Sequence, residues 1–276
     1  MGKITRTWSL MADSWQVLKL DKSLVLFPFI SSICCLLLMA SFAVPICATG
    51  AWHPPTHDAE TQRQILYYGT LFVFYVLLNF IVVFFNAALV ACAATRMGGG
   101  QPTLADGLRA AAARLPVIVG WALVSATVGL ILRIIEDRSS RVGQIIAGIL
   151  GAAWTVMTFL VVPILVIENK NPIAALQEST VLLKKTWGER LTSNLSFHIL
   201  LLLLLLPAFG LAALGIAMGN SVALLTCMGL AAIYAILVML VYSALHAIFQ
   251  TALYLYTRDG VVPQGFREDV LGAVLR

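Results

Sequence analysis

The sequence predicts an all-α integral membrane protein with six transmembrane helices. These helices form three tandem repeat units, each made of an interfacial amphipathic helix followed by a transmembrane hairpin. Three observations support this prediction: a composition dominated by apolar residues, six apolar runs long enough to cross a bilayer, and a polar helical segment that recurs along the chain.

The composition indicates the fold class. Of the 276 residues, 60% are hydrophobic and only 11% are charged, whereas a soluble domain carries about 25% charged residues. The apolar runs leave no room for a soluble domain, so we expect residues 1–276 to form a single polytopic membrane domain.

The apolar runs define the predicted spans. A helix needs about 20 apolar residues to cross the hydrocarbon core of a bilayer. Six segments meet this length: 24–48, 65–94, 116–135, 143–167, 195–218 and 222–256. Residues 261–276, which follow the last repeat unit, are predicted to be a short cytoplasmic tail.

The distribution of basic residues predicts the orientation, because cytoplasmic loops of membrane proteins hold an excess of lysine and arginine. Placing both termini in the cytoplasm puts fourteen of the 18 basic residues on the inner side. The four exceptions are Arg63, Arg133, Arg138 and Arg141. The net charge of +5 is therefore explained by topology and by attraction to anionic lipid headgroups, and we expect no nucleic-acid partner.

The polar segment "NPIAALQESTVLLKKTWGERL", residues 171–191, separates two of the apolar runs. Asn171 suits the N-cap and Pro172 the first turn of a helix, and apolar residues then recur at steps of three and four. This pattern is typical of an amphipathic helix lying in the cytoplasmic interface. The aromatic and basic side chains predicted to lie in the interface, here and in two similar segments, are Trp8, Trp15, Lys19, Arg109, Lys184, Lys185 and Trp187.

Two sequence matches suggest a duplication. The segment "ADSWQVLK" at 12–19 matches "QESTVLLK" at 177–184, which lies 165 residues later, and "FNAAL" at 85–89 matches "FQTAL" at 249–253, which lies 164 residues later. A third polar segment, "PTLADGLRAAAARLP", contains a predicted capping box formed by Thr103 and Asp106. We therefore predict parallel repeat units at about 1–96, 97–170 and 171–260.

Polar side chains within the spans are the candidate functional residues, because such groups are rare inside a bilayer. They form stripes on the second and sixth spans: Asn79 and Asn86, then Ser243, His246, Gln250 and Tyr254. One interpretation is a polar pathway open to the cytoplasm. The other is that the amides form hydrogen bonds between helices and fix their packing.

Residues that could support catalysis or metal binding are scarce. His53 and His57 in "HPPTH" have metal-like spacing, but two prolines prevent the regular helix that such spacing requires. The chain has no acid pair at a shared depth and no phosphate-binding glycine loop, since "MGGGQP" at 97–102 lacks the downstream lysine and serine. We expect no metal, no cofactor and no enzymatic activity.

Several blocks together resemble an uncharacterised bacterial family of six-span membrane proteins, known as a domain of unknown function. They are "SWQVLKLDKSLVLFP", "FFNAALVACAATRMGGGQPTLADGLRAA", "GWALVSATVGLILRIIE", "WTVMTFLVVPILVIENKNPIAALQESTVLLKKTWGERL" and "ALYLYTRDGVVPQGF". The polar segment at 171–191 is more distantly similar to one in the membrane domain attached to some glycerophosphodiester phosphodiesterases. The resemblance implies a location in the bacterial inner membrane and no particular activity.

Two functional hypotheses follow. The first is a non-enzymatic envelope or lipid-associated scaffold, which would bind membrane lipids and assemble as a homo-oligomer or with a partner membrane protein. The second is a channel or transporter lined by the polar stripes of the second and sixth spans. A membrane enzyme ranks third, because the sequence brings no acidic or nucleophilic residues together.

Overall fold

The computed structural model describes residues 3–49, 61–138, 141–187, 192–260 and 262–267, together with Leu271. Every secondary-structure element within these residues is a helix, as the sequence predicts. In chain order the elements are α1 (Lys3–Leu20), η1 (Lys22–Val25), α2 (Leu26–Thr49), α3 (Thr61–Met97), α4 (Leu104–Ala113), α5 (Leu115–Arg138), α6 (Arg141–Met157), α7 (Val161–Glu168), α8 (Pro172–Trp187), α9 (Thr192–Ala217) and α10 (Ser221–Asp259). The segment with His53 and His57 lies outside the described residues.

Five stretches of the described residues are long and apolar enough to cross a membrane. They are Lys22–Val44, Ile65–Met97, Leu115–Glu136, Gly143–Glu168 and Ser221–Asp259. They coincide with five of the six predicted spans. The remaining one, 195–218, corresponds to α9, in which the described apolar helix Leu201–Ala217 is shorter than the roughly 20 residues that a span requires.

The predicted span 143–167 is confirmed as an apolar stretch of spanning length, Gly143–Glu168, but it is not one continuous helix. It divides into α6 and α7, with a turn at residues 158–160. Pro163 explains the break, because proline has no N–H and its ring collides with the carbonyl group four residues earlier, that of Phe159. The chain resumes helical hydrogen bonding where the N–H of Ile164 donates to the Leu160 carbonyl at 3.2 Å.

Two predicted helix starts are confirmed in detail. The Asn171 side chain accepts a hydrogen bond from the N–H of Ala174 at 2.8 Å, which caps α8. At α4, Thr103 and Asp106 form a complete capping box, in which each side chain accepts a hydrogen bond from the other residue's backbone N–H. Both caps depend on short-range sequence, which explains why they could be predicted.

The described chain separates into two compact units. The first contains Met1–Pro28, Ala93–Gln101 and Leu183–Arg276, and the second contains Phe29–Cys92 and Pro102–Leu182. The three tandem repeat units follow different boundaries and stay a prediction.

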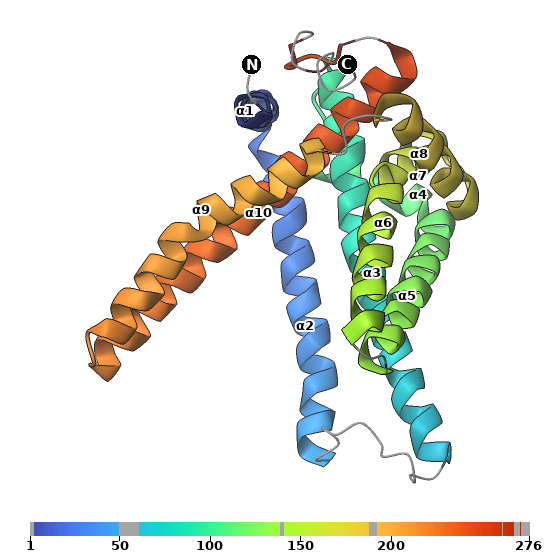
Figure 1. The fold of residues 1–276 in the computed structure, drawn as a ribbon. Coiled ribbons are helices and arrows are strands. Elements are labelled where there is room, and N and C mark those ends of the chain that lie inside the picture. The colour runs from blue at the N-terminus through green and yellow to red at the C-terminus, as the bar shows by residue number, and fades with distance from the viewer. Residues whose placement is uncertain are drawn as a thin grey trace. The chain divides into compact units, whose positions relative to one another are not determined.

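In the first compact unit, α9 and α10 form an antiparallel hairpin and lie side by side (Figure 1). Gly215 allows their close approach, since a Cβ atom at this position would lie only 2.7 Å from the Cβ of Cys227. Helix α1 packs against both members of the hairpin. It runs across the direction of α10 and is seen nearly end-on in Figure 1.

In the second compact unit, α5 packs against α6. The indole rings of Trp121 and Trp154 stack between them with their centroids 5.8 Å apart. The start of α8 is close to α5, because a Cβ atom at Gly120 would lie 3.1 Å from Cγ of Pro172. Each compact unit therefore combines a helical hairpin with a helix that is too polar to span a membrane.

Candidate functional site

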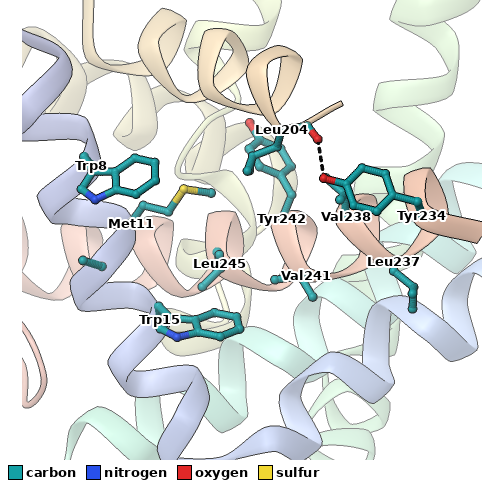
Figure 2. A pocket seen from close by; sticks show the side chains of 11 residues that line it. Trp8, Met11, Trp15, Leu204, Tyr234, Leu237, Val238, Val241, Tyr242 and Leu245 are labelled. Carbon is teal, nitrogen blue, oxygen red and sulfur yellow. Dashed lines mark hydrogen bonds between the residues drawn. The ribbon is translucent and has the colours of Figure 1, made fainter. Parts of the chain in front are cut away.

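An apolar cavity of about 530 Å³ lies between α1 and the α9–α10 hairpin. We call it the α1 cavity. Its wall is formed by Trp8, Met11, Ala12 and Trp15 of α1, Leu204 of α9, and Tyr234, Leu237, Val238, Val241, Tyr242 and Leu245 of α10. Figure 2 shows the α1 side chains projecting towards α10. Its volume lies within the range of about 300–1,000 Å³ that is typical of ligand sites.

The pattern of burial along α1 explains how the cavity forms. Leu10, Ser14 and Val17 are buried, at the helical spacing that faces a neighbouring element. Trp8 and Trp15 are seven residues apart and stay 58% and 41% exposed. One side of α1 therefore anchors the helix, while the two indoles border the cavity.

The buried polar groups of α1 are satisfied locally and by the C-terminal segment. The Ser14 hydroxyl donates to the carbonyl of Leu10 at 2.9 Å, within the helix. Asp13 is 1% exposed, and its carboxylate lies 3.2 Å from Nε of Arg267. The backbone N–H of Arg267 also donates to Asp13, at 3.3 Å, so the buried charge has both an ionic and a hydrogen-bond partner.

The segment before Arg267 is fixed to the same part of the molecule. The N–H of Gln264 donates to the carbonyl of Met97 at 3.2 Å. Gly265 adopts a φ of +93°, and a Cβ atom there would lie 2.7 Å from Cγ2 of Val17. Only glycine combines this backbone conformation with so close an approach to α1.

On the hairpin side, a hydrogen bond joins the two helices beside the cavity. The Tyr234 hydroxyl donates to the Leu204 carbonyl at 2.9 Å (Figure 2). Leu204 lies in the helical turn before Pro207, which has no N–H to contribute. Tyr242 forms the neighbouring part of the wall, and its ring stacks on that of His246 with the centroids 5.8 Å apart.

The two predicted polar stripes lie in different compact units. In the second unit, the Asn79 amide donates to the Tyr75 carbonyl of its own helix at 2.9 Å, and Asn86 is half-buried. The four residues of the other stripe lie on α10 in the first unit: Ser243 is exposed, His246 is half-buried, and Gln250 and Tyr254 are buried. The convergence of the stripes at one site stays a prediction.

The predicted interfacial residues that the structure describes are mostly exposed. The Lys19 ammonium lies 5.9 Å from the centroid of the Trp15 ring, a cation–π distance. Arg109 pairs with Asp106 at 3.6 Å at the surface of α4, and Lys184 of α8 is also exposed. The side chains of Lys185 and Trp187 lie outside the described residues.

A second polar arrangement stabilises the break between α6 and α7. The buried Ser179 hydroxyl of α8 accepts a hydrogen bond from the N–H of Leu160 at 3.2 Å and donates one to the carbonyl of Met157 at 2.7 Å. One side chain thus satisfies a donor and an acceptor that the break removes from the regular helical pattern.

Near Ser179, a lysine lies between two carboxylates. Lys170 forms ion pairs with Glu168 and with Glu178, both at 2.5 Å. The hydrogen bonds to Glu168 and Glu178 raise the pKa of Lys170 above its usual value. This cluster links the end of α7 to α8.

Sequence reasoning missed the α1 cavity and the role of Ser179. The spacing of Trp8, Met11, Ala12 and Trp15, at steps of three, one and three, could have indicated a shared face. The matching of Ser14 with Ser179 could have suggested a buried position. Among the described residues, no three His, Cys, Asp or Glu side chains lie close enough together to hold a metal ion.

Comparison with known proteins gives one family and no individual relative. The model of a family of unknown function, DUF6159, matches residues 65–265. No curated protein and no solved structure matches the chain, so the similarity to the phosphodiesterase-associated membrane domain stays a prediction. The matched residues make up more than half of the sequence and include most of the described helices. The chain therefore belongs to the DUF6159 family of unknown function.

Proposed function

We propose that the protein is a non-enzymatic, lipid-associated scaffold of the bacterial inner membrane. The observation that carries this proposal is the position of α1. Helix α1 packs against the apolar α9–α10 hairpin, and its side chains Trp8, Trp15 and Lys19 stay exposed. Aromatic rings beside a basic residue are typical of the membrane–water interface.

The other two polar helices support the same role. Arg109 on α4 and Lys184 on α8, which belong to the predicted interfacial set, are both exposed. Basic side chains at the cytoplasmic surface attract anionic headgroups. A protein with three such helices would hold lipid, a second copy or a partner membrane protein against one face of the bilayer.

The ion pair between Asp13 and Arg267 supports six spans with both termini in the cytoplasm. It joins the N-terminal helix to the C-terminal segment, which is the contact expected if both lie on the same side of the membrane and the chain crosses an even number of times. Five stretches already have spanning length, and α9, with 26 residues, supplies the sixth at about 1.5 Å of rise per residue. The excess of basic residues on this side supports a cytoplasmic location for it.

The internal repeat is supported by matching environments. Asp13 and Glu178, which the sequence match aligns, both form ion pairs with a basic residue. The aligned Ser14 and Ser179 are both fully buried. The residues of the second match also have similar burial: Ala87, Ala88 and Leu89 are as buried as their aligned counterparts Thr251, Ala252 and Leu253.

Reconstitution into vesicles separates the scaffold from a channel or transporter. We expect purified protein in vesicles of phosphatidylethanolamine and phosphatidylglycerol to give no solute flux above that of empty vesicles. We also expect its self-association, measured by cross-linking, to weaken when phosphatidylglycerol is replaced by phosphatidylcholine. A solute flux that disappears in the double variant Asn86→Ala with Gln250→Ala would contradict the scaffold and favour the polar pathway.

A further inference from the structure

We propose that the α1 cavity binds the hydrocarbon chain of one anionic phospholipid, with the headgroup beside Lys19. This inference rests on the proposed association with lipid and goes beyond it, because it names one binding site and the class of lipid that the site selects. It does not depend on whether the protein conducts solutes.

The chemistry of the wall selects a hydrocarbon. All eleven wall residues are aliphatic, aromatic or methionine. The Tyr234 hydroxyl already donates to the Leu204 carbonyl, and this bond closes the wall between α9 and α10. Such a surface offers burial of apolar area and dispersion contacts to a ligand, which suit an acyl chain better than a polar solute.

The location makes a bilayer lipid the occupant. The wall is contributed by α10, a span of 39 residues, and by α1, which is too polar to be a span. Leu237 lines the cavity and is 57% exposed, and other apolar residues of α10 such as Ile233 and Ile236 are exposed as well. A lipid tail beside the hairpin therefore reaches the cavity without leaving the membrane, whereas a soluble ligand would have to cross the interface.

Charge complementarity indicates an anionic headgroup. Trp15 borders the cavity, and the Lys19 ammonium lies 5.9 Å from its ring, one helical turn further along α1. Tryptophan and lysine at this depth contact the headgroup region. Lys22, which follows directly in η1, is also exposed and adds positive charge at the same end of α1.

The test uses a lipid that carries its own label. The full-length protein is reconstituted into phosphatidylcholine vesicles that contain phosphatidylglycerol with a photoactivatable diazirine on one acyl chain. After illumination, the labelled residues are identified by mass spectrometry. We expect labels on α1 between Trp8 and Trp15 and on α10 between Tyr234 and Leu245.

A pair of matched variants shows whether the cavity itself is responsible. Ala12→Trp with Val238→Trp fills the cavity, whereas Ala232→Trp with Val222→Trp makes the same changes at exposed positions of α10. We expect the filled variant to lose roughly tenfold in labelling at these sites, since excluding only about two methylene groups has this effect. The control variant should be labelled like the unmodified protein. Equal circular dichroism and gel-filtration behaviour show that both variants are folded.

The headgroup is tested separately. Lys19→Glu should reduce labelling by phosphatidylglycerol to the level given by a phosphatidylcholine probe with the same acyl chain, and Lys184→Glu should not. Equal labelling of the filled and control variants would overturn the site, and so would lipid labels on the chain that leave α1 and α10 unlabelled. Equal labelling of the unmodified protein by both probes would overturn the anionic lipid. A solute flux from a protein that is labelled as expected would overturn the scaffold and leave this inference intact.

Discussion

Asp13 and Arg267 are 254 residues apart in the chain, and they form an ion pair that fixes the C-terminal segment to α1. The carboxylate is buried, whereas the arginine side chain is 56% exposed. The partly exposed guanidinium of Arg267 therefore neutralises the carboxylate of Asp13, which is buried in the first compact unit.

Arg267→Ala should lower the free energy of unfolding by about 1–2 kcal/mol, which is less than the 3–5 kcal/mol of a fully buried pair because the guanidinium is partly solvated. Arg109→Ala removes an ion pair between two exposed side chains and should lower it much less, because solvent screens both charges. Thermal unfolding in detergent, followed by circular dichroism, measures both. Equal effects of the two variants would contradict a special role for the Asp13 pair.

Ser179→Ala should destabilise the second compact unit by about 1–3 kcal/mol, because Leu160 N–H and Met157 carbonyl lose their shared partner in a buried position. Ser14→Ala is the matched control, since Ser14 is equally buried but its hydroxyl donates only to the Leu10 carbonyl within α1. We expect the control to change stability by at most about 0.5 kcal/mol. Hydrogen exchange of residues 157–161 provides a local measurement, and faster exchange is expected only in Ser179→Ala.

The α6–α7 break and the caps show what the sequence alone could predict. The caps at Asn171 and Thr103 depend on residues within one helical turn, and both were predictable. Pro163 was visible in the sequence, but the break also needs Ser179, a residue of another helix, to satisfy the exposed backbone groups. That pairing is a tertiary contact, and no local pattern encodes it.

The α1 cavity likewise combines residues that the local sequence identifies with tertiary contacts that it does not encode. Trp8 and Trp15, two residues of the α1 cavity, were singled out in the sequence because their chemistry and spacing are local, and their interfacial position stays a prediction. The cavity itself combines residues of α1 with residues more than 180 positions later, beginning with Leu204. Apolar residues in a span look alike in sequence whether they face lipid, a helix or a cavity, so the wall could not be separated from the rest of α10.

Two glycine substitutions in α9 should have effects of opposite sign. Gly215→Ala places a Cβ atom 2.7 Å from Cys227 Cβ, whereas a Cβ atom at Gly210 has open space. Overpacking at Gly215 should lower the free energy of unfolding by about 1–3 kcal/mol, and Gly210→Ala should raise it by up to about 1 kcal/mol through better helix propensity. Thermal unfolding of both variants tests the close packing of α9 on α10. Stabilisation by both would contradict that packing.

The Lys170 cluster predicts a loss of stability at alkaline pH. Glu168 and Glu178 raise the pKa of Lys170 above its unfolded value of 10.5. The stabilisation is therefore fully present below pH 10.5 and decreases as the pH rises through the higher pKa of the folded state. The difference in melting temperature between the unmodified protein and Lys170→Met should be constant near neutrality and become smaller above this pH. Lys184→Met, which replaces an exposed lysine of α8, should show no such change, and a difference that grows with pH would contradict the assignment.

Cysteine accessibility decides between the scaffold and the polar pathway. In a protein whose native cysteines are replaced by serine or alanine, His246→Cys and Gln250→Cys place thiols on the polar stripe of α10. Gln250 is only 9% exposed and the buried amide suits helix packing, so the scaffold predicts that neither thiol reacts with a membrane-impermeant maleimide added from the cytoplasmic side. Leu225→Cys, at an exposed apolar position of the same helix, serves as the lipid-facing control and should also be protected. Reaction at both 246 and 250 with protection at 225 requires water along the stripe, which only the channel or transporter provides.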